Sequence, residues 1–181
     1  MKFKQFTIVF VGLSIIGCNN SPVSEHEMEH LTNKTIHLEM FERVQFKEES
    51  IPFDEFRRNF RHIYIVFLED RCAPCYPKFI EWHTKLEKLT PIEDFTVLFI
   101  INARHYENFV IEAKKYGEFN ERFYHVMDPE NDFLRRNIDI PRKFIDLSLL
   151  IDSANRIKLI GAPYATEDMT KVFHLITGVK Q

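Results

Sequence analysis

Two cysteines three positions apart are the residues of this chain with the clearest capacity for chemistry. They stand at the ends of the run Cys72-Ala73-Pro74-Cys75. Two thiols at this spacing lie about one helical turn apart, so they can close a disulfide with each other or resolve a mixed disulfide with a substrate. The thiolate is the form that attacks a disulfide sulfur, so reactivity depends on what stabilises the anion. The spacing therefore indicates thiol–disulfide exchange.

We expect the neighbouring elements to stabilise such a thiolate. Residues 63–68 form a continuous run of β-type apolar residues, as expected for a central strand buried on both faces. After the cysteines, Phe79 begins a series of apolar residues at helical spacing that continues to about Leu89. If this helix begins at about Cys72, the sulfur of Cys72 lies beside free backbone N–H groups at the positive end of the helix. Both features favour the thiolate.

The order of strand, cysteine pair and helix resembles the active site of the thioredoxin fold. The CAPC motif is similar to the CxPC pattern of the membrane-anchored thioredoxin-like proteins of the bacterial envelope, the TlpA/ResA type. The resemblance covers about residues 36–178, and the cysteine pair is its only specific motif. It implies a three-layer sandwich with a mixed central sheet flanked by helices. It also implies a thiol–disulfide oxidoreductase without a cofactor, in which Cys72 attacks and Cys75 resolves, with protein thiols or disulfides and a redox partner protein as partners.

The remaining pattern predicts an α/β domain over residues 35–181. We expect an opening strand or hairpin over residues 36–46. Further helices are expected at 54–61, 106–116, about 128–137 and 166–177, and further strands at 95–101, 123–127, 147–151 and 156–160. Helices between buried strands give an α/β sandwich with a mixed sheet, which is the thioredoxin order with an insertion between core strands. Trp82 and His83 are expected to pack in the core rather than to take part in chemistry.

Composition limits the chain to one domain plus an extension. The chain has 181 residues, 45% of them hydrophobic and 18 of them Phe, which is enough for a well-filled core. Its formal net charge is −3, and no basic stripe is present. Because affinity for nucleic acid depends on a surplus of Lys and Arg, nucleic acid is not an expected partner.

Residues 1–17 are interpreted as a targeting segment. Lys2 and Lys4 precede an uncharged run over 6–16 that is too short to span a bilayer comfortably. The sequence that ends Gly17-Cys18 resembles a bacterial lipobox, in which Cys18 would carry lipid and begin the mature protein. The alternative is an ordinary secretory peptide with a coincidental cysteine. We therefore expect a lipid-anchored protein of the bacterial cell envelope, with its domain in the periplasm or on the outer face.

Residues 18–34 are predicted to be a tether between the lipid and the domain. They are polar and lack apolar periodicity. His26 and His30, among three glutamates, could suggest a metal site, but a solvated charge run is far more common and no ligand cluster elsewhere supports it. We predict no metal site. Removing residues 1–17 changes the net charge from −3 to −5, so the domain should stand off an anionic membrane surface.

The region facing the cysteines departs from the family pattern. Thioredoxin-like oxidoreductases carry a cis-proline just before the strand that faces the cysteine pair. Here the matching strand end, residues 149–152, puts Asp146 at that place, and Pro141 lies five residues earlier. Either the loop is remodelled so that Pro141 reaches the site, or the cis-proline is absent and the site lacks a backbone platform for substrate. Pro77, two residues after Cys75, is expected to remove a helix hydrogen bond and kink the helix.

Charged residues next to the pair also differ from the family pattern. Arg71 stands where the family has an aromatic residue, and its guanidinium would favour the Cys72 thiolate. Val66 occupies the position where a buried acidic side chain often transfers protons. Glu69 or Asp70 could act as the base instead, although adjacent carboxylates would also oppose thiolate formation. We interpret four residues as supporting the two cysteines: Arg71, Pro74, Glu69 and Asp70.

Other interpretations of the two cysteines stay open. A static disulfide across so short a loop would constrain the unfolded chain only weakly. A zinc half-site would need two more ligands, and the folded region has no second CxxC or spaced histidine pair. A copper-handling protein of this fold would use a wider cysteine spacing with a dedicated histidine. The main alternative is a redox-inactive binding or accessory lipoprotein of the thioredoxin fold that lacks the cis-proline.

Overall fold

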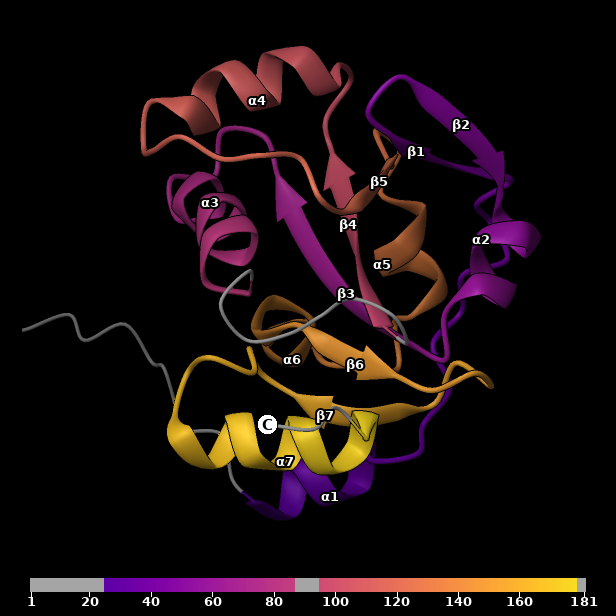
Figure 1. The fold of residues 1–181 in the computed structure, drawn as a ribbon. Helices are drawn as coiled ribbons and strands as arrows, with labels where there is room; N and C mark the ends of the chain where they lie inside the picture. Colours follow the sequence, from indigo (N-terminus) through magenta and orange to yellow (C-terminus); the bar gives the residue numbers. More distant parts are fainter. Residues whose placement is uncertain (1–24, 87–94, 179–181) are drawn as a thin grey trace, which may run out of the picture.

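A computed structural model describes residues 25–86 and 95–178 and contains one mixed β-sheet with helices on both faces (Figure 1). The strands are β1 (Arg43–Phe46), β2 (Glu49–Pro52), β3 (His62–Glu69), β4 (Phe95–Asn102), β5 (Tyr124–Met127), β6 (Leu149–Ile151) and β7 (Ile157–Ile160). The helices are α1 (Glu25–Leu31), α2 (Phe53–Asn59), α3 (Cys75–Leu86), α4 (Tyr106–Lys114), α5 (Asp132–Arg136), α6 (Arg142–Leu147) and α7 (Glu167–Thr177). None of the described helices is long and apolar enough to cross a membrane.

The sheet has the strand order β2-β1-β5-β4-β3-β6-β7. Strand β4 runs parallel to both β3 and β5, because α3 and α4 return the chain across the same face between them. Strand β6 pairs with β3 in the antiparallel direction, and β1 does the same with β5. The predicted mixed central sheet is therefore confirmed. Its carboxyl-terminal edge at β3 carries the cysteine pair.

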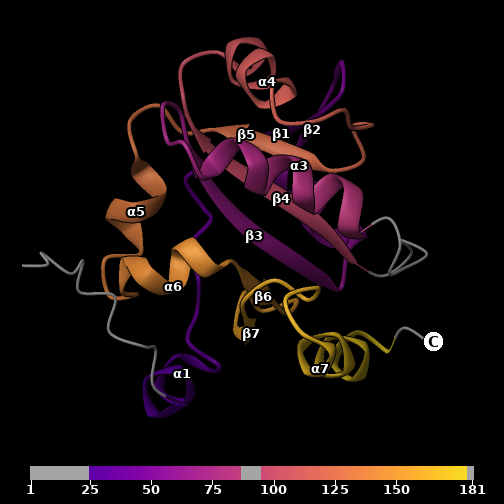
Figure 2. The ribbon, with the colours of Figure 1, turned by 90° about the vertical axis from the view of Figure 1, so that its left-hand side faces the viewer.

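Alternating side chains of β3 divide the core into two layers. Ile63, Ile65 and Phe67 belong to one buried cluster, and the residues between them belong to the other. Helices α3, α4 and α7 cover the second cluster, and α1, α2, α5 and α6 cover the first. Figure 2 shows α3 lying in front of β3 and β4, as this division requires. The three-layer sandwich implied by the sequence is thus present.

The amino-terminal part of the described chain is folded further than the sequence predicted. Residues 25–31, assigned to the tether, form helix α1, and Leu31 is 5% exposed within the core. The backbone N–H of Asn33 donates to the carbonyl oxygen of Ile157 at 2.8 Å, which ties the chain after α1 to β7. The tether prediction was wrong for this stretch because Met28 and Leu31, one turn apart, form a short apolar face among acidic residues. Residues 1–24, including Cys18, lie outside the described residues.

Local differences from the predicted elements have simple causes. The alternation over residues 36–40 forms no strand, although Ile36 and Leu38 are fully buried. The helix expected from Asp128 begins four residues later as α5, because the Asp128 carboxylate accepts hydrogen bonds from the N–H groups of Asp132 and Phe133 at 2.8 and 3.0 Å. Helix α6 was not predicted. The end expected for the cysteine helix near Leu89 falls in 87–94, outside the described residues.

His83 on α3 is a core residue, as predicted, and it is 2% exposed. Its ring packs among Phe79, Phe99, Phe119 and Phe123, with ring centroids 4.7 to 5.2 Å apart. Neither ring nitrogen has a hydrogen-bond partner among the described residues. Burial, reinforced by the nearby Arg122 and His125, lowers the pKa of His83 to about 3. Folding therefore holds this imidazole in its neutral form.

We expect His83→Phe to make the fold less sensitive to acid. In the wild type the unfolded state binds a proton at His83 below about pH 6.5 while the folded state does not, so stability is lost as the pH falls from about 6.5 toward 3. Each pH unit in that window costs about 1.4 kcal/mol for one such group. Between pH 6.5 and 4.5 the variant should therefore lose about 2 to 3 kcal/mol less than the wild type in urea unfolding. Equal losses in the two proteins would contradict this account, whatever their stabilities at pH 7.

Candidate active site

Cys72 and Cys75 form a disulfide between the end of β3 and the start of α3, with their Cα atoms 5.3 Å apart. Cys75 is the first residue of α3 and is 9% exposed, whereas Cys72 is more accessible. The backbone N–H of Glu69 donates to the sulfur of Cys75 at 3.4 Å. One sulfur is therefore open to an incoming group, and the other is held against the end of the strand.

The start of α3 differs from the expectation. The helix begins at Cys75 rather than Cys72, after a turn in which the N–H of Cys75 donates to the carbonyl oxygen of Cys72 at 2.9 Å. Two of the residues here, Pro74 and Pro77, have no N–H to offer. The helix end therefore presents fewer free donors to the Cys72 sulfur than predicted. Pro77 lies in the first turn, so its missing N–H removes no intrahelical hydrogen bond. The kink expected at Pro77 therefore lacks its cause.

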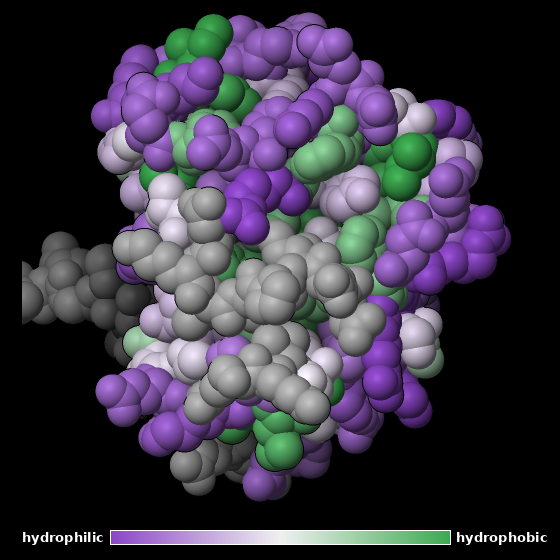
Figure 3. Space-filling view, viewed as in Figure 1, coloured by the Kyte–Doolittle hydropathy of each residue, from purple (hydrophilic) through white to green (hydrophobic). Residues whose placement is uncertain are grey.

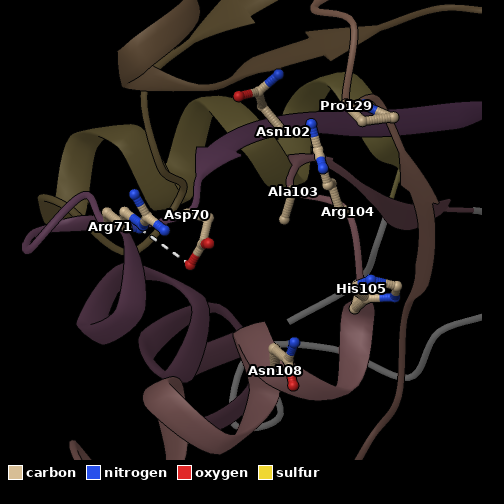
Figure 4. Close-up of a pocket in the computed structure, with 8 residues that line it drawn as sticks. All are labelled: Asp70, Arg71, Asn102, Ala103, Arg104, His105, Asn108 and Pro129. Atoms are coloured by element: carbon tan, nitrogen blue, oxygen red, sulfur yellow. Dashed lines mark hydrogen bonds between the residues drawn. The ribbon is translucent and has the colours of Figure 1, made fainter.

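Arg71 and Asp70 face a second hollow rather than the one at the disulfide. Arg71 has a left-handed backbone (φ 62°), and its side chain is exposed. The Asp70 carboxylate accepts hydrogen bonds from the Tyr76 hydroxyl at 2.8 Å and from the N–H of Arg71 at 3.0 Å. This hollow, of about 520 Å³, lies at the ends of β3 and β4. Figure 4 shows Asp70 and Asn108 of α4 directed into the same space. Asp70 is thus a hydrogen-bond acceptor that orders the loop.

The disulfide opens into its own cavity of about 320 Å³. Its lining consists of residues from β3, α3 and α6 around the two sulfurs: Phe67, Glu69, Cys72, Pro74, Cys75, Lys78, Arg142 and Asp146. The guanidinium of Arg142 lies 2.9 Å from the Glu69 carboxylate and 2.6 Å from that of Asp146, and it stacks over the Phe67 ring at 4.6 Å. Glu69, predicted as a base, is therefore already engaged in an ion pair. Pro74 also lines the cavity, and its supporting role stays a prediction.

Asp146, not Pro141, faces the cysteines. Asp146 belongs to α6 and lines the disulfide cavity. It is the residue that the sequence comparison placed at the cis-proline position, counting back from residues 149–152. Pro141 is the residue that precedes the first turn of α6, outside that lining. The described residues contain no cis peptide bond. Helix α6 thus occupies the position at which the resembling proteins present a cis-proline.

Lys78 is a site residue that the sequence reasoning missed. Its ammonium donates to the carbonyl oxygen of Asp146 at 2.8 Å and approaches that of Phe67 at 3.5 Å. Burial lowers the pKa of Lys78 to about 8, although the Asp146 carboxylate raises it and Arg142 lowers it further. The available signal was its position three residues after Cys75, which places both side chains on one helix face. The cavity thus holds a cation as well as the two sulfurs.

Comparison with known proteins identifies the fold. No protein-family model matches the chain, and no curated protein sequence matches it. A solved structure described as a thiol:disulfide interchange protein DsbE, from Chlorobium tepidum, matches with a TM-score of 0.53 and 15% identity, over 75% of this chain and 92% of that one. The thioredoxin domain of a thiol-disulfide oxidoreductase from Bacteroides vulgatus matches with a TM-score of 0.49 and 14% identity, over 81% and 97%. At such identity the likeness to the first shows the fold alone.

The chain therefore has a thioredoxin-like fold, as its resemblance to that family implied. Within this fold a disulfide of CxxC spacing stands at the carboxyl-terminal end of β3, between α3 and α6. The architecture and the cysteine pair together define a thioredoxin-like protein that carries a CxxC disulfide at the end of a central strand.

Proposed function

We propose that the protein is a thiol–disulfide oxidoreductase that exchanges disulfides through Cys72 and Cys75. The observation that carries this proposal is the unequal exposure of the two sulfurs at the mouth of one cavity. An accessible sulfur can meet a substrate, and a buried neighbour one turn away can displace it. Such an arrangement serves exchange better than it serves stability, because a loop this short constrains the unfolded chain weakly.

The exchange proceeds in two balanced steps. In the reduced enzyme the Cys72 thiolate attacks one sulfur of a substrate disulfide, forms a mixed disulfide and releases the other substrate sulfur as a thiolate. Cys75 then loses its proton and attacks the Cys72 sulfur, which closes the Cys72–Cys75 bond and releases the second substrate sulfur as a thiolate. Two electrons have passed from the enzyme dithiol to the substrate disulfide. The reverse sequence oxidises a substrate dithiol, and a redox partner protein restores the starting form.

We further propose that Cys18 anchors the protein to a bacterial membrane through lipid. The proposal is supported by the short apolar run of residues 6–16 after two lysines and by the Gly17-Cys18 junction. With Cys18 lipidated, no cysteine is left over besides the pair. The domain would then face the periplasm or lie on the outer face of the cell envelope, where disulfides persist.

A redox titration of the full chain tests the proposed activity. A Cys18→Ser background in detergent leaves only the two site sulfurs to report, and alkylation followed by mass measurement counts free thiols in glutathione buffers. We expect a reversible two-electron transition between about −120 and −270 mV, the range of known oxidoreductases. The midpoint will tell whether the protein acts as reductant or oxidant. A pair that stays locked at every potential would rule out exchange as the function.

The second candidate function is that of a redox-inactive binding or accessory lipoprotein. One observation favours it: α6, with the paired side chains of Arg142 and Glu69, occupies the wall where related sites present a cis-proline to the substrate backbone. A stoichiometric complex with a partner protein that survives the double change Cys72→Ser/Cys75→Ser would support this candidate. Loss of the complex in the double variant would support exchange.

A further inference from the structure

Lys78 lies on the same side of α3 as the resolving cysteine. It follows Cys75 by three positions, and side chains at this spacing are neighbours on a helix. The Lys78 ammonium is 3.5 Å from the carbonyl oxygen of Phe67, and the Cys75 sulfur is 3.4 Å from the amide nitrogen of Glu69. Both side chains thus contact the same end of β3 and line the same cavity, together with Cys72. The Lys78 side chain and the two cysteines therefore line one cavity that is partly open to solvent.

Among the described residues, the ammonium of Lys78 has no carboxylate partner of its own in this space. Three charged side chains face it: Glu69 from β3, and Arg142 and Asp146 from α6. Arg142 pairs with both carboxylates. The hydrogen bonds that Lys78 makes to the described residues go to main-chain carbonyl oxygens instead, at 2.8 Å and 3.5 Å. A desolvated cation that is held only by carbonyl dipoles is strongly stabilised when an anion forms beside it.

We propose that Lys78 supplies the counter-charge for the thiolate of the reduced Cys72–Cys75 pair. This inference rests on the proposed function. Reduction by two glutathione molecules breaks the Cys72–Cys75 bond and forms one glutathione disulfide. It leaves one site sulfur as thiolate and the other as thiol, and one proton goes to solvent. The ammonium then has an anion beside it, which stabilises the dithiol form relative to the disulfide. The sequence suggested Arg71 for this role, but Arg71 lines the neighbouring hollow.

Substitution of Lys78 in the full chain tests this role. In the Cys18→Ser background and in detergent, Lys78→Met should shift the equilibrium with glutathione about tenfold toward the disulfide, which corresponds to a potential about 30 mV lower. The pH midpoint of thiolate absorbance in the reduced protein should rise by about one unit, since an opposite charge nearby lowers a thiol pKa by one unit or more. Lys78→Arg keeps the charge and should retain most of the wild-type values.

Lys85→Met is the matched control. Lys85 lies on the same helix, is exposed and pairs with Glu81 at 3.3 Å, so its loss should move neither the potential nor the thiolate midpoint. If Lys78→Met also leaves both unchanged while the wild type exchanges normally, the inference is wrong and the proposed function stands. If the wild type is locked in glutathione, the proposed function fails. Reduction with a dithiol reagent still permits the thiolate titration that tests Lys78.

A measurement on unsubstituted Lys78 covers the case in which Lys78→Met does not fold. Coupling between two titrating groups is reciprocal, so a thiolate stabilised by Lys78 must raise the pKa of Lys78 in return. NMR titration of the Lys78 side chain in the oxidised and reduced forms should give a higher pKa in the reduced form. Identical pKa values in the two forms would overturn the inference without any substitution at this position.

Discussion

Cys72→Ser is expected to abolish disulfide exchange, whereas Cys75→Ser is expected to stop at the mixed disulfide. The accessible Cys72 sulfur makes the first bond to substrate, and a serine oxygen cannot replace it. With Cys75 replaced, nothing displaces the substrate from Cys72. In the Cys18→Ser background, reduced protein treated with glutathione disulfide should gain one glutathione in Cys75→Ser and none in Cys72→Ser, as read by mass.

The control for this pair is Ala73→Ser, which adds a hydroxyl between the cysteines at an exposed position and leaves both sulfurs in place. It should exchange like the wild type and carry no lasting adduct. If Cys72→Ser and Cys75→Ser behave alike, the division of roles between the two sulfurs is wrong. A glutathione adduct in Cys72→Ser alone would reverse the assignment and make Cys75 the attacking residue.

Phe79→Ala should destabilise the domain by about 3 to 5 kcal/mol, the usual cost of removing a fully buried aromatic side chain. Phe79 is 0% exposed and packs one turn after the disulfide against Phe99, Phe109 and Phe119, with ring centroids 4.8 to 5.4 Å apart. It therefore joins α3, which carries Cys75, to β4 and α4. The cavity left by alanine would be lined by rings that cannot close it without moving the helix. Urea unfolding of the oxidised protein measures the loss.

Ile111→Ala provides the comparison for this stability loss. Ile111 lies on α4 and is 59% exposed, so its truncation should change stability by no more than about 0.5 kcal/mol. Figure 3 shows such hydrophobic residues in small patches on a mostly hydrophilic face. Similar losses in Phe79→Ala and Ile111→Ala would mean that α3 is not held by the packing described here.

The sheet and its main helices could be predicted because their patterns are strong. The continuous apolar runs that became β3 and β4 leave no alternative to central strands, and α7 begins at Glu167, directly after Thr166, whose side chain caps it. Short elements were harder. Helix α6 has six residues and follows a proline, so it carries too few apolar positions for a helical period to be visible.

The position of the cysteine pair could be predicted from the sequence, but the charged residues around it could not. The spacing of Cys72 and Cys75 alone indicates that they can form the disulfide that is present, and counting back from the strand end points to Asp146, which lines the same cavity. The partners of Glu69 and Lys78 come from α6, some 70 residues along the chain, so no local pattern could reveal them. Arg71 was predicted to stabilise the Cys72 thiolate because it is adjacent to Cys72 in the sequence. Its backbone is left-handed, however, and its side chain lines the neighbouring hollow.

Helix α1 has a consequence for how the protein would stand on a membrane. With lipid at Cys18, as proposed, only residues 19–24 separate the bilayer from α1, and six residues span at most about 20 Å. Figures 1 and 2 both place α1 at the bottom of the molecule, well below the carboxyl-terminal end of β3. So short a connection would keep the α1 end of the domain next to the membrane, and the disulfide would face away from it. Redox partners would then approach from the aqueous side, and proteins embedded in the same bilayer would need a domain that rises above this one.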